Sequence, residues 1–407
     1  MRLLIITPST LRGGVEEYIL KIASAALEKG WDVYAAFPKT EGTVSLIRDF
    51  MAQGVVYHPL AITETNRRRR SRLQKDLPNL IRTAILLLRV RPDVAQIVLP
   101  YTNYCYGSVL ACGMLQMPTL VRFGLVPSIF TFTPTQLKLY AWARARNQQW
   151  MTVSDNNRKL VCESFRIPEN QVLRIYNGTQ LAAQETIGSQ AESILLRHQI
   201  RQELGLHADS RLVLTVGRLD PQKGYSDLIS VIPHLIEEFP DLRFVWAGEG
   251  TQRDRLLDQL RKYGIEKKVL LLGYRSDVPR LLAAADLFVF PTLYEGHSSA
   301  LIEAMAYGLP VVASDASGIP EVIEDKVHGL LFYTGDSCDL LETLRWGLRH
   351  PEEMRAIAKN ARRRAQDFPK QKMIEETLQA LEKLAEGKQH LLPCKRFKQR
   401  IPQRKTD

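Results

Sequence analysis

Short apolar runs alternate with longer amphipathic segments along most of this 407-residue chain. The short runs are rich in Val, Ile, Leu and Phe, and helical periodicity follows most of them. Strands that alternate with helices are typical of parallel sheets in doubly wound α/β domains. The sequence therefore predicts strands at residues 3–7, 33–37, 55–57, 94–99, 119–122, 151–154 and 172–176, and again at 212–216, 244–247, 269–272, 287–290, 311–313 and 330–332.

The interval 181–207 is polar and helix-prone and has no clear strand. We therefore predict two Rossmann-like domains, at residues 1–185 and 186–387, followed by a basic, disordered tail at 388–407. The second domain would include a terminal helix at about 370–386. Two such domains facing each other leave a ligand cleft at the carboxyl ends of both sets of strands.

The composition, with 45% hydrophobic and 24% charged residues, is typical of a soluble globular protein. No apolar run is long enough to span a bilayer, and the first residues resemble a strand rather than a signal peptide. We expect a cytoplasmic protein. Five scattered cysteines without C-x-x-C spacing favour unpaired structural thiols in a reducing compartment.

The net charge of +11 is concentrated in two segments. Residues 66–91 carry +8 and residues 388–407 carry +6, so the rest of the chain carries −3. The run at 67–75 precedes an amphipathic helix, which suits an anionic membrane surface. A solvated loop is the alternative, and no aromatic interleaving supports nucleic acid. We expect the apolar stripe of this helix (Leu77, Leu80, Ile81, Ala84, Ile85 and Leu88) to face the core, so that membrane contact would come mostly from charge.

Two carboxylates, Glu295 and Glu303, lie eight residues apart around a predicted helix start. Glu295 follows the apolar run 287–291, and Glu303 lies about two turns into the helix. Ser298 and Ser299 are plausible N-caps, and Gly308 ends the helix. The first backbone N–H groups of such a helix, from Ser298, Ser299 and Ala300, suit a diphosphate. Two solvated glutamates on an amphipathic helix are the alternative.

A second candidate loop follows the strand at 212–216 and contains Arg218 and Lys223 between two glycines. Arginine supplies planar bidentate donors and lysine a compact charge, so the pair can converge on a diphosphate. These charges would also stabilise a departing nucleoside diphosphate. A basic pair on a solvated surface is the alternative for this motif taken by itself.

Together these motifs resemble those of retaining glycosyltransferases of family 4, which have the two-domain GT-B fold. Residues 294–312 are similar to the E-x7-E signature, residues 217–224 to the G-R-x(4)-K-G loop, and residues 12–18 to the G-G-x-E loop with Gly13 and Gly14. The resemblance implies a nucleotide-sugar donor and a saccharide or lipid-linked acceptor. It implies that Glu303 binds the ribose and that Glu295 binds the transferred sugar. It also implies that Gly296 and His297 lie next to this sugar. It implies no cofactor and no metal, and the chain has no D-x-D pair.

The N-terminal half departs from the family pattern. Gly124 stands where many relatives carry a histidine, Gln96 stands where another histidine would fall, and residues 177–180 replace N-G-V-D. Arg122 is a candidate for part of the missing histidine's role. The alternative is that Arg122 has only a structural role at the end of its strand. The main prediction is transfer of a sugar to a lipid-linked or surface-polysaccharide acceptor. The alternatives are a nucleotide-sugar epimerase and a non-catalytic relative that binds membrane or polyanion.

Overall fold

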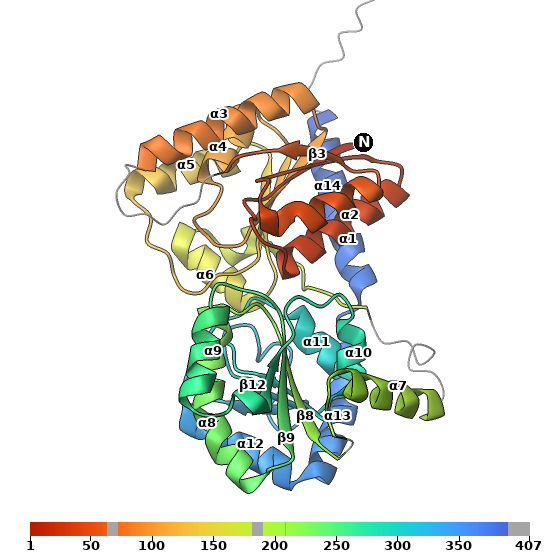
Figure 1. The fold of residues 1–407 in the computed structure, drawn as a ribbon. Helices are drawn as coiled ribbons and strands as arrows, with labels where there is room; N and C mark the ends of the chain where they lie inside the picture. Colours follow the sequence, from red (N-terminus) through yellow and green to blue (C-terminus); the bar gives the residue numbers. More distant parts are fainter. Residues whose placement is uncertain (63–71, 181–189, 208, 390–407) are drawn as a thin grey trace, which may run out of the picture.

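The computed structural model describes residues 1–62, 72–180, 190–207 and 209–389, and shows two α/β domains stacked end to end (Figure 1). Each domain has one parallel sheet between two layers of helices. Every predicted strand overlaps an observed one, so the two-domain doubly wound fold is confirmed. The predicted domain boundary near residue 185, the basic residues 67–71 and the tail from 390 lie outside the described residues.

The first domain contains a seven-stranded sheet with the order β3-β2-β1-β4-β5-β6-β7. Its strands are β1 (Arg2–Ile6), β2 (Asp32–Phe37), β3 (Val56–Pro59), β4 (Val94–Leu99), β5 (Thr119–Phe123), β6 (Gln148–Thr152) and β7 (Val172–Arg174). Its helices are α1 (Gly14–Glu28), α2 (Val44–Ala52), α3 (Arg72–Val90), α4 (Tyr106–Met114), α5 (Pro134–Arg144) and α6 (Asp155–Phe165).

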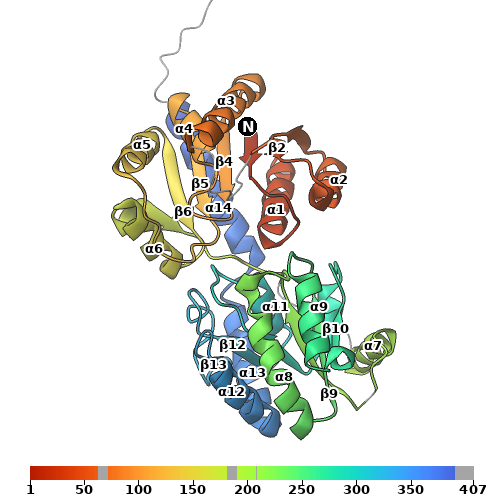
Figure 2. The same cartoon turned by 60° about the vertical axis from the view of Figure 1, so that its left-hand side comes forward.

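The second domain, the lower one in Figure 2, contains a six-stranded sheet. Its strand order is β10-β9-β8-β11-β12-β13. Its strands are β8 (Arg211–Val216), β9 (Leu242–Ala247), β10 (Val269–Leu271), β11 (Leu287–Phe290), β12 (Val311–Ser314) and β13 (Leu330–Phe332). The helices that follow the first domain are α7 (Gln190–Glu203), α8 (Tyr225–Glu238), α9 (Arg253–Lys262), α10 (Val278–Ala284), α11 (Ser299–Ala306), α12 (Ser337–Arg349), α13 (Pro351–Ala365) and α14 (Lys370–Gln389).

Side chains that alternate along each strand build two cores in the first domain. Leu4 and Ile6 of β1 pack with α3, α4, α5 and α6 on one face of the sheet. Leu3 and Ile5 pack on the other face with α1, α2 and the last helix, α14. The chain therefore crosses from the first domain to the second and, at its end, crosses back to the first. The two crossing segments run side by side. Lys370 N donates to Thr179 O at 2.9 Å, and Thr179 N donates to Phe368 O at 3.1 Å.

Helix α3 is oriented differently from the sequence-based expectation. The stripe predicted to face the core instead supplies the exposed residues Leu77, Ile81, Ile85 and Leu88, while Leu80 and Ala84 are partly buried. The buried side of the helix consists of Asn79, Thr83, Leu86, Leu87 and Val90. The expectation was wrong because α3 turns a different face toward α4: Thr83 and Ser108 share a buried hydrogen bond of 2.9 Å, and Leu86, Leu87 and Val90 pack into the core. No described helix is long and apolar enough to cross a bilayer.

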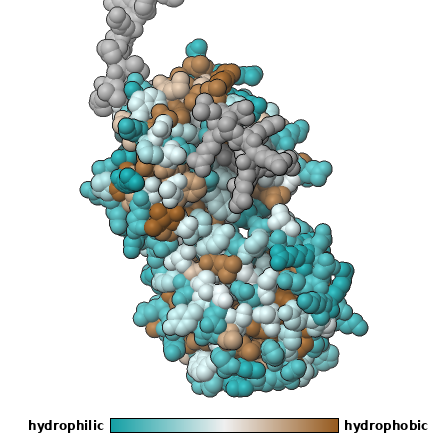
Figure 3. Space-filling model, turned by 90° about the vertical axis from the view of Figure 1, so that its left-hand side faces the viewer, coloured by the Kyte–Doolittle hydropathy of each residue, from teal (hydrophilic) through white to brown (hydrophobic). Residues whose placement is uncertain are grey.

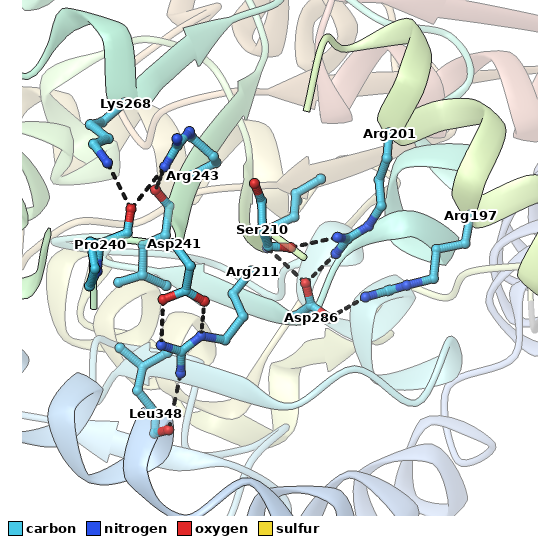
Figure 4. A network of polar contacts seen from close by, with 12 residues as sticks. Arg197, Arg201, Ser210, Arg211, Pro240, Asp241, Arg243, Lys268, Asp286 and Leu348 are labelled. Carbon is cyan, nitrogen blue, oxygen red and sulfur yellow. Dashed lines mark hydrogen bonds and ion pairs between the residues drawn. The ribbon is translucent and has the colours of Figure 1, made fainter. Parts of the chain in front are cut away.

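The amino ends of the second sheet are held by a network of charged residues (Figure 4). Arg197 and Arg201 of α7 both pair with Asp286, which precedes β11. Arg211 at the start of β8 binds Asp241 through two hydrogen bonds of 2.6 and 2.8 Å. The Asp286 contacts attach α7 to the sheet, and the Arg211–Asp241 pair joins the starts of β8 and β9. The carboxyl ends of the strands are left to form the interdomain boundary.

Candidate active site

Two loops at the carboxyl edge of the second sheet lie directly against each other. One follows β8 (217–224) and the other follows β11 (291–298). Leu293 N donates to Gln222 O at 2.7 Å, and Gln222 Nε2 donates to Tyr294 O at 2.9 Å. Gly224 has a φ of +66°, and a Cβ there would lie 1.8 Å from Pro291 O. Only glycine permits this approach, so the last glycine of the G-R-x(4)-K-G loop is required both by packing and by its positive φ.

The contact between these loops places Lys223 beside Glu295. Lys223 Nζ donates to Glu295 Oε2, and the two side chains are only 13% and 14% exposed. Shielding from solvent makes such a pair stronger than one on an open surface. Both residues were predicted to contact the donor, but their direct ion pair was not predicted from the sequence.

Arg218 extends from the same loop toward the first domain. Arg218 Nη1 lies 3.2 Å from Asp220 Oδ2, and its side chain is 39% exposed. A Cβ on Gly13 would lie 3.3 Å from Arg218 Cδ, so the two domains meet at this point. Gly13 is the N-cap of α1 and Gly14 is its first residue. The positive end of the α1 dipole and the Arg218 guanidinium therefore favour an anion at the same boundary.

Glu16, in the first turn of α1, is a buried carboxylate that the sequence-based site did not include. Burial raises its pKa, while a hydrogen bond with Ser9 and the charge of Arg218 act in the opposite direction. The signal that identifies it is the final position of the G-G-x-E loop. Its burial beside Arg218 places a carboxyl group with a raised pKa next to the anion-favouring region.

The other predicted carboxylate, Glu303, lies in α11. Ser298 caps this helix by accepting a hydrogen bond from Leu301 N at 3.3 Å, which confirms the predicted helix start. The N–H groups of Ser299 and Ala300 belong to the first turn, where a helix offers donors without helical partners. Glu303 accepts a hydrogen bond of 2.8 Å from Thr179 Oγ1, and burial raises its pKa. Thr179, which lies in the connection between the domains, thus holds one carboxylate oxygen of Glu303, the residue predicted to bind the ribose.

His297 lies in the same loop, but its ring is only 2% exposed. It stacks on Tyr176 with centroids 4.6 Å apart and meets the edge of Phe368 at 4.9 Å. Burial lowers its pKa to about 3, so the imidazole is neutral. The ring therefore packs where the two crossings of the chain between the domains meet. The His297 carbonyl, by contrast, accepts a 2.7 Å hydrogen bond from Asn177 Nδ2.

Asn177 continues this connection into the first domain. Arg122 Nη2 donates to Asn177 Oδ1 at 2.7 Å, and the Arg122 guanidinium carbon lies 3.8 Å from the centre of the Tyr18 ring. Arg122 is 2% exposed, and burial lowers its pKa. Gln96, which stands where the family pattern has another histidine, donates to Tyr18 Oη at 2.8 Å. Arg122 and Gln96 thus both have clear packing roles within the first domain.

Gly124 and Gly296 lie at a close contact between the domains. A Cβ on Gly296 would lie 2.3 Å from Gly124 O and 2.8 Å from Val153 Cγ2. Gly124 O also accepts a 3.3 Å hydrogen bond from Asn157 Nδ2. The position of the expected family histidine is therefore occupied by backbone that touches the Glu295 loop.

The family resemblance implies a nucleobase contact near Tyr274 and Arg275, which follow β10. Arg275 pairs with Asp277 at 2.7 Å and with Glu203 at 3.0 Å, which favours a structural role. Tyr274 is about half exposed, and the Arg12 guanidinium carbon lies 5.6 Å from its ring centre. Tyr274 is therefore the more accessible of the two for contact with a nucleobase.

Residues 197–364 match the model of the family described as Glycosyl transferases group 1. All of the matched residues lie in the part of the chain that forms the second domain. This agrees with the resemblance drawn from residues 217–224 and 294–312.

Curated relatives and a solved structure extend the comparison. The chain is 31% identical over 56% of its length to an N-acetylgalactosamine-N,N'-diacetylbacillosaminyl-diphospho-undecaprenol 4-alpha-N-acetylgalactosaminyltransferase of Campylobacter jejuni, and spans 58% of that relative. It is 27% identical over 67% of its length to a UDP-Gal:alpha-D-GlcNAc-diphosphoundecaprenol alpha-1,3-galactosyltransferase of Escherichia coli, and spans 70% of it. Anabaena HepE, solved with UDP-glucose, has a TM-score of 0.74 and 22% identity, covering 94% of this chain and all of the other. The last match shows that the fold is GT-B.

Proposed function

We propose that this protein is a retaining glycosyltransferase that moves a sugar from a nucleotide-sugar to a lipid-linked or surface-polysaccharide acceptor at the inner face of the cell membrane. The observation that carries the proposal is the shielded Lys223–Glu295 pair beside Arg218, at the boundary where the carboxyl edges of both domains meet. Two basic groups and a carboxylate held this closely suit a diphosphate joined to a hydroxyl-rich sugar.

The assigned roles follow from charge and position. Arg218 and Lys223 bind the diphosphate, assisted by the first N–H groups of α11 and the Gly13–Gly14 turn. Glu303 binds the ribose, and Glu295 binds the transferred sugar. During transfer, the acceptor oxygen bonds to the anomeric carbon as the bond to the diphosphate breaks. The hydroxyl proton passes to the leaving diphosphate, whose charge Arg218 and Lys223 stabilise.

The acceptor class is supported by the relatives and by charge. The Campylobacter and Escherichia coli relatives have names that specify diphosphoundecaprenol-linked acceptors. The two basic segments of this chain favour an anionic surface, where such acceptors are found.

An activity screen tests the proposal. The protein is incubated with UDP-, GDP- and ADP-sugars, with or without a bacterial lipid extract, and nucleoside diphosphate release and sugar incorporation are measured. The expected result is sugar incorporation that depends on the extract and is lost in Glu295→Gln. Release of an epimerised sugar without any acceptor would instead identify an epimerase. Donor binding without turnover in any arm would identify a non-catalytic relative.

A further inference from the structure

Helix α3 exposes a continuous row of large aliphatic side chains on the outside of the first domain. Leu77, Ile81, Ile85 and Leu88 are between 47% and 61% exposed. At 3.6 residues per turn they share one face over roughly 16 Å of helix. Figure 3 shows hydrophobic residues gathered at the top of the upper lobe, where Figure 1 draws α3. We call these four residues the α3 ridge.

The packing of α3 on α4 fixes this orientation. A Cβ on Gly107 of α4 would lie 2.3 Å from Asp76 O, so the two helix backbones are nearly in contact. Thr83 and Ser108 share a buried hydrogen bond of 2.9 Å across the same interface. Rotating α3 to bury the α3 ridge would break this bond and replace the glycine contact with larger side chains. The exposure therefore follows from the way in which the helix is attached.

Basic residues flank the ridge. Arg82 and Arg89 are exposed along one edge of it, and exposed Arg91 follows the helix end. Across residues 66–91 the sequence carries +8. An aliphatic face bordered by cations is the pattern of a helix that lies in the interface of an anionic bilayer.

Other occupants fit the ridge less well. A second copy packed through the same face would bring Arg82, Arg89 and Arg91 of both chains close together. Single-stranded nucleic acid would need aromatic stacking partners, and the ridge is aliphatic.

From these observations we infer that the α3 ridge inserts into the interfacial layer of an anionic membrane, with Arg82, Arg89 and Arg91 at the level of the lipid phosphates. The inference rests on the proposed function for the location of the acceptor, and it adds the surface that brings the enzyme to it. Apolar burial contributes to this attachment, whereas the sequence predicted membrane contact mostly through charge.

Vesicle sedimentation tests the inference with the full chain. The vesicles contain one part phosphatidylglycerol to two parts phosphatidylcholine. The test variant is Ile81→Gln/Ile85→Gln. The matched control is Ile194→Gln/Leu195→Gln, which removes two equally exposed aliphatic side chains (63% and 59%) from α7 in the other domain. The expected result is a partition coefficient lowered by roughly tenfold or more in the test variant and unchanged in the control.

A salt series separates the apolar contribution from the electrostatic one. Arg82→Gln/Arg89→Gln should weaken binding at low salt and make little difference at high salt, because salt screens its charges. Equal sedimentation of wild type and Ile81→Gln/Ile85→Gln would overturn the inference, as would binding that high salt abolishes completely. Loss of a concentration-dependent dimer in the ridge variant, without vesicle binding by wild type, would show that a second copy covers the ridge.

The outcome is independent of the proposed activity. Vesicle binding needs no turnover, and transfer to a detergent-dispersed acceptor should persist in the ridge variant. A protein that binds vesicles through the ridge but transfers no sugar would contradict the proposed function alone.

Discussion

Replacing Lys223 with Met should weaken nucleoside diphosphate binding by about tenfold. A charge-assisted hydrogen bond contributes roughly 1.5–3 kcal/mol. Lys223 is already paired with Glu295 in the unliganded protein, and both side chains are largely shielded. A diphosphate must therefore share or displace this partner, which places the expected loss near the lower end, about 1.5 kcal/mol.

The same contact predicts the behaviour of the partner residue. Glu295→Gln removes the competing carboxylate, so diphosphate affinity should stay the same or rise severalfold while turnover falls. In the Glu295→Gln background, Lys223→Met should cost more than it does in wild type, approaching about 3 kcal/mol or about 150-fold. The two substitutions should thus show a clear coupling free energy in a double-mutant cycle.

Titration calorimetry with UDP, GDP and ADP measures this cycle, and thermal melting checks that each variant is folded. Lys262→Met, an exposed lysine at the end of α9, controls for the change in net charge. The reasoning fails if Lys223→Met binds all three nucleotides like wild type. It also fails if Glu295→Gln and Lys223→Met lose equal affinity, because the pair would then act as one ligand-binding unit.

Three further predictions follow from the site. Glu303→Gln should weaken nucleoside diphosphate binding while leaving inorganic diphosphate binding unchanged, and equal loss for both ligands in calorimetry would contradict its assignment to the ribose. Gly296→Ala places a Cβ 2.3 Å from Gly124 O, so it should separate the domains, enlarge the radius of gyration in X-ray scattering and reduce turnover; Gly387→Ala, with open space around it, is the control. His297 has a pKa lowered from 6.5 to about 3, so the unfolded state takes up the proton first and the free energy of unfolding falls as pH drops from 6.5 toward 3. His297→Phe should keep the ring packing and show a shallower fall in melting temperature between pH 7 and pH 4.5; identical slopes would argue against this histidine as the source.

The strand pattern of this chain could be predicted from the sequence because its parallel strands are apolar on both faces. Strand β4 is buried along its whole length, and Leu287–Phe290 is a continuous apolar run. The helix start at Ser298 was predictable because capping depends on local sequence. Arg218 and Lys223 were identified for a similar reason, since their loop has a characteristic spacing.

The orientation of α3 was not predictable in the same way. Its sequence has aliphatic residues on two sides, and periodicity alone selected Leu77 and Ile81 for the core. The orientation is set by Gly107 and Ser108 of α4, which lie against the Asp76 carbonyl and the Thr83 side chain of α3. Contacts of this kind depend on residues distant in sequence. The Lys223–Glu295 pair and the burial of His297 likewise depend on contacts between residues that are far apart in the sequence.

The missing histidine at position 124 is connected to the presence of Arg122. A Cβ on Gly124 would lie 3.1 Å from Arg122 Nη1 and 3.3 Å from Leu99 O, so a larger side chain and the guanidinium would compete for the same space. Arg122 uses that space to reach Asn177, which in turn holds the carbonyl of His297 next to Glu295 and Gly296. The first domain therefore contributes a hydrogen-bonded chain to the Glu295 loop where many relatives contribute an imidazole. A leaving diphosphate that accepts the acceptor's proton does not need that imidazole. The departure at Gly124 is thus compatible with the proposed transfer, and it leaves the first domain joined to the Glu295 loop through Arg122 and Asn177.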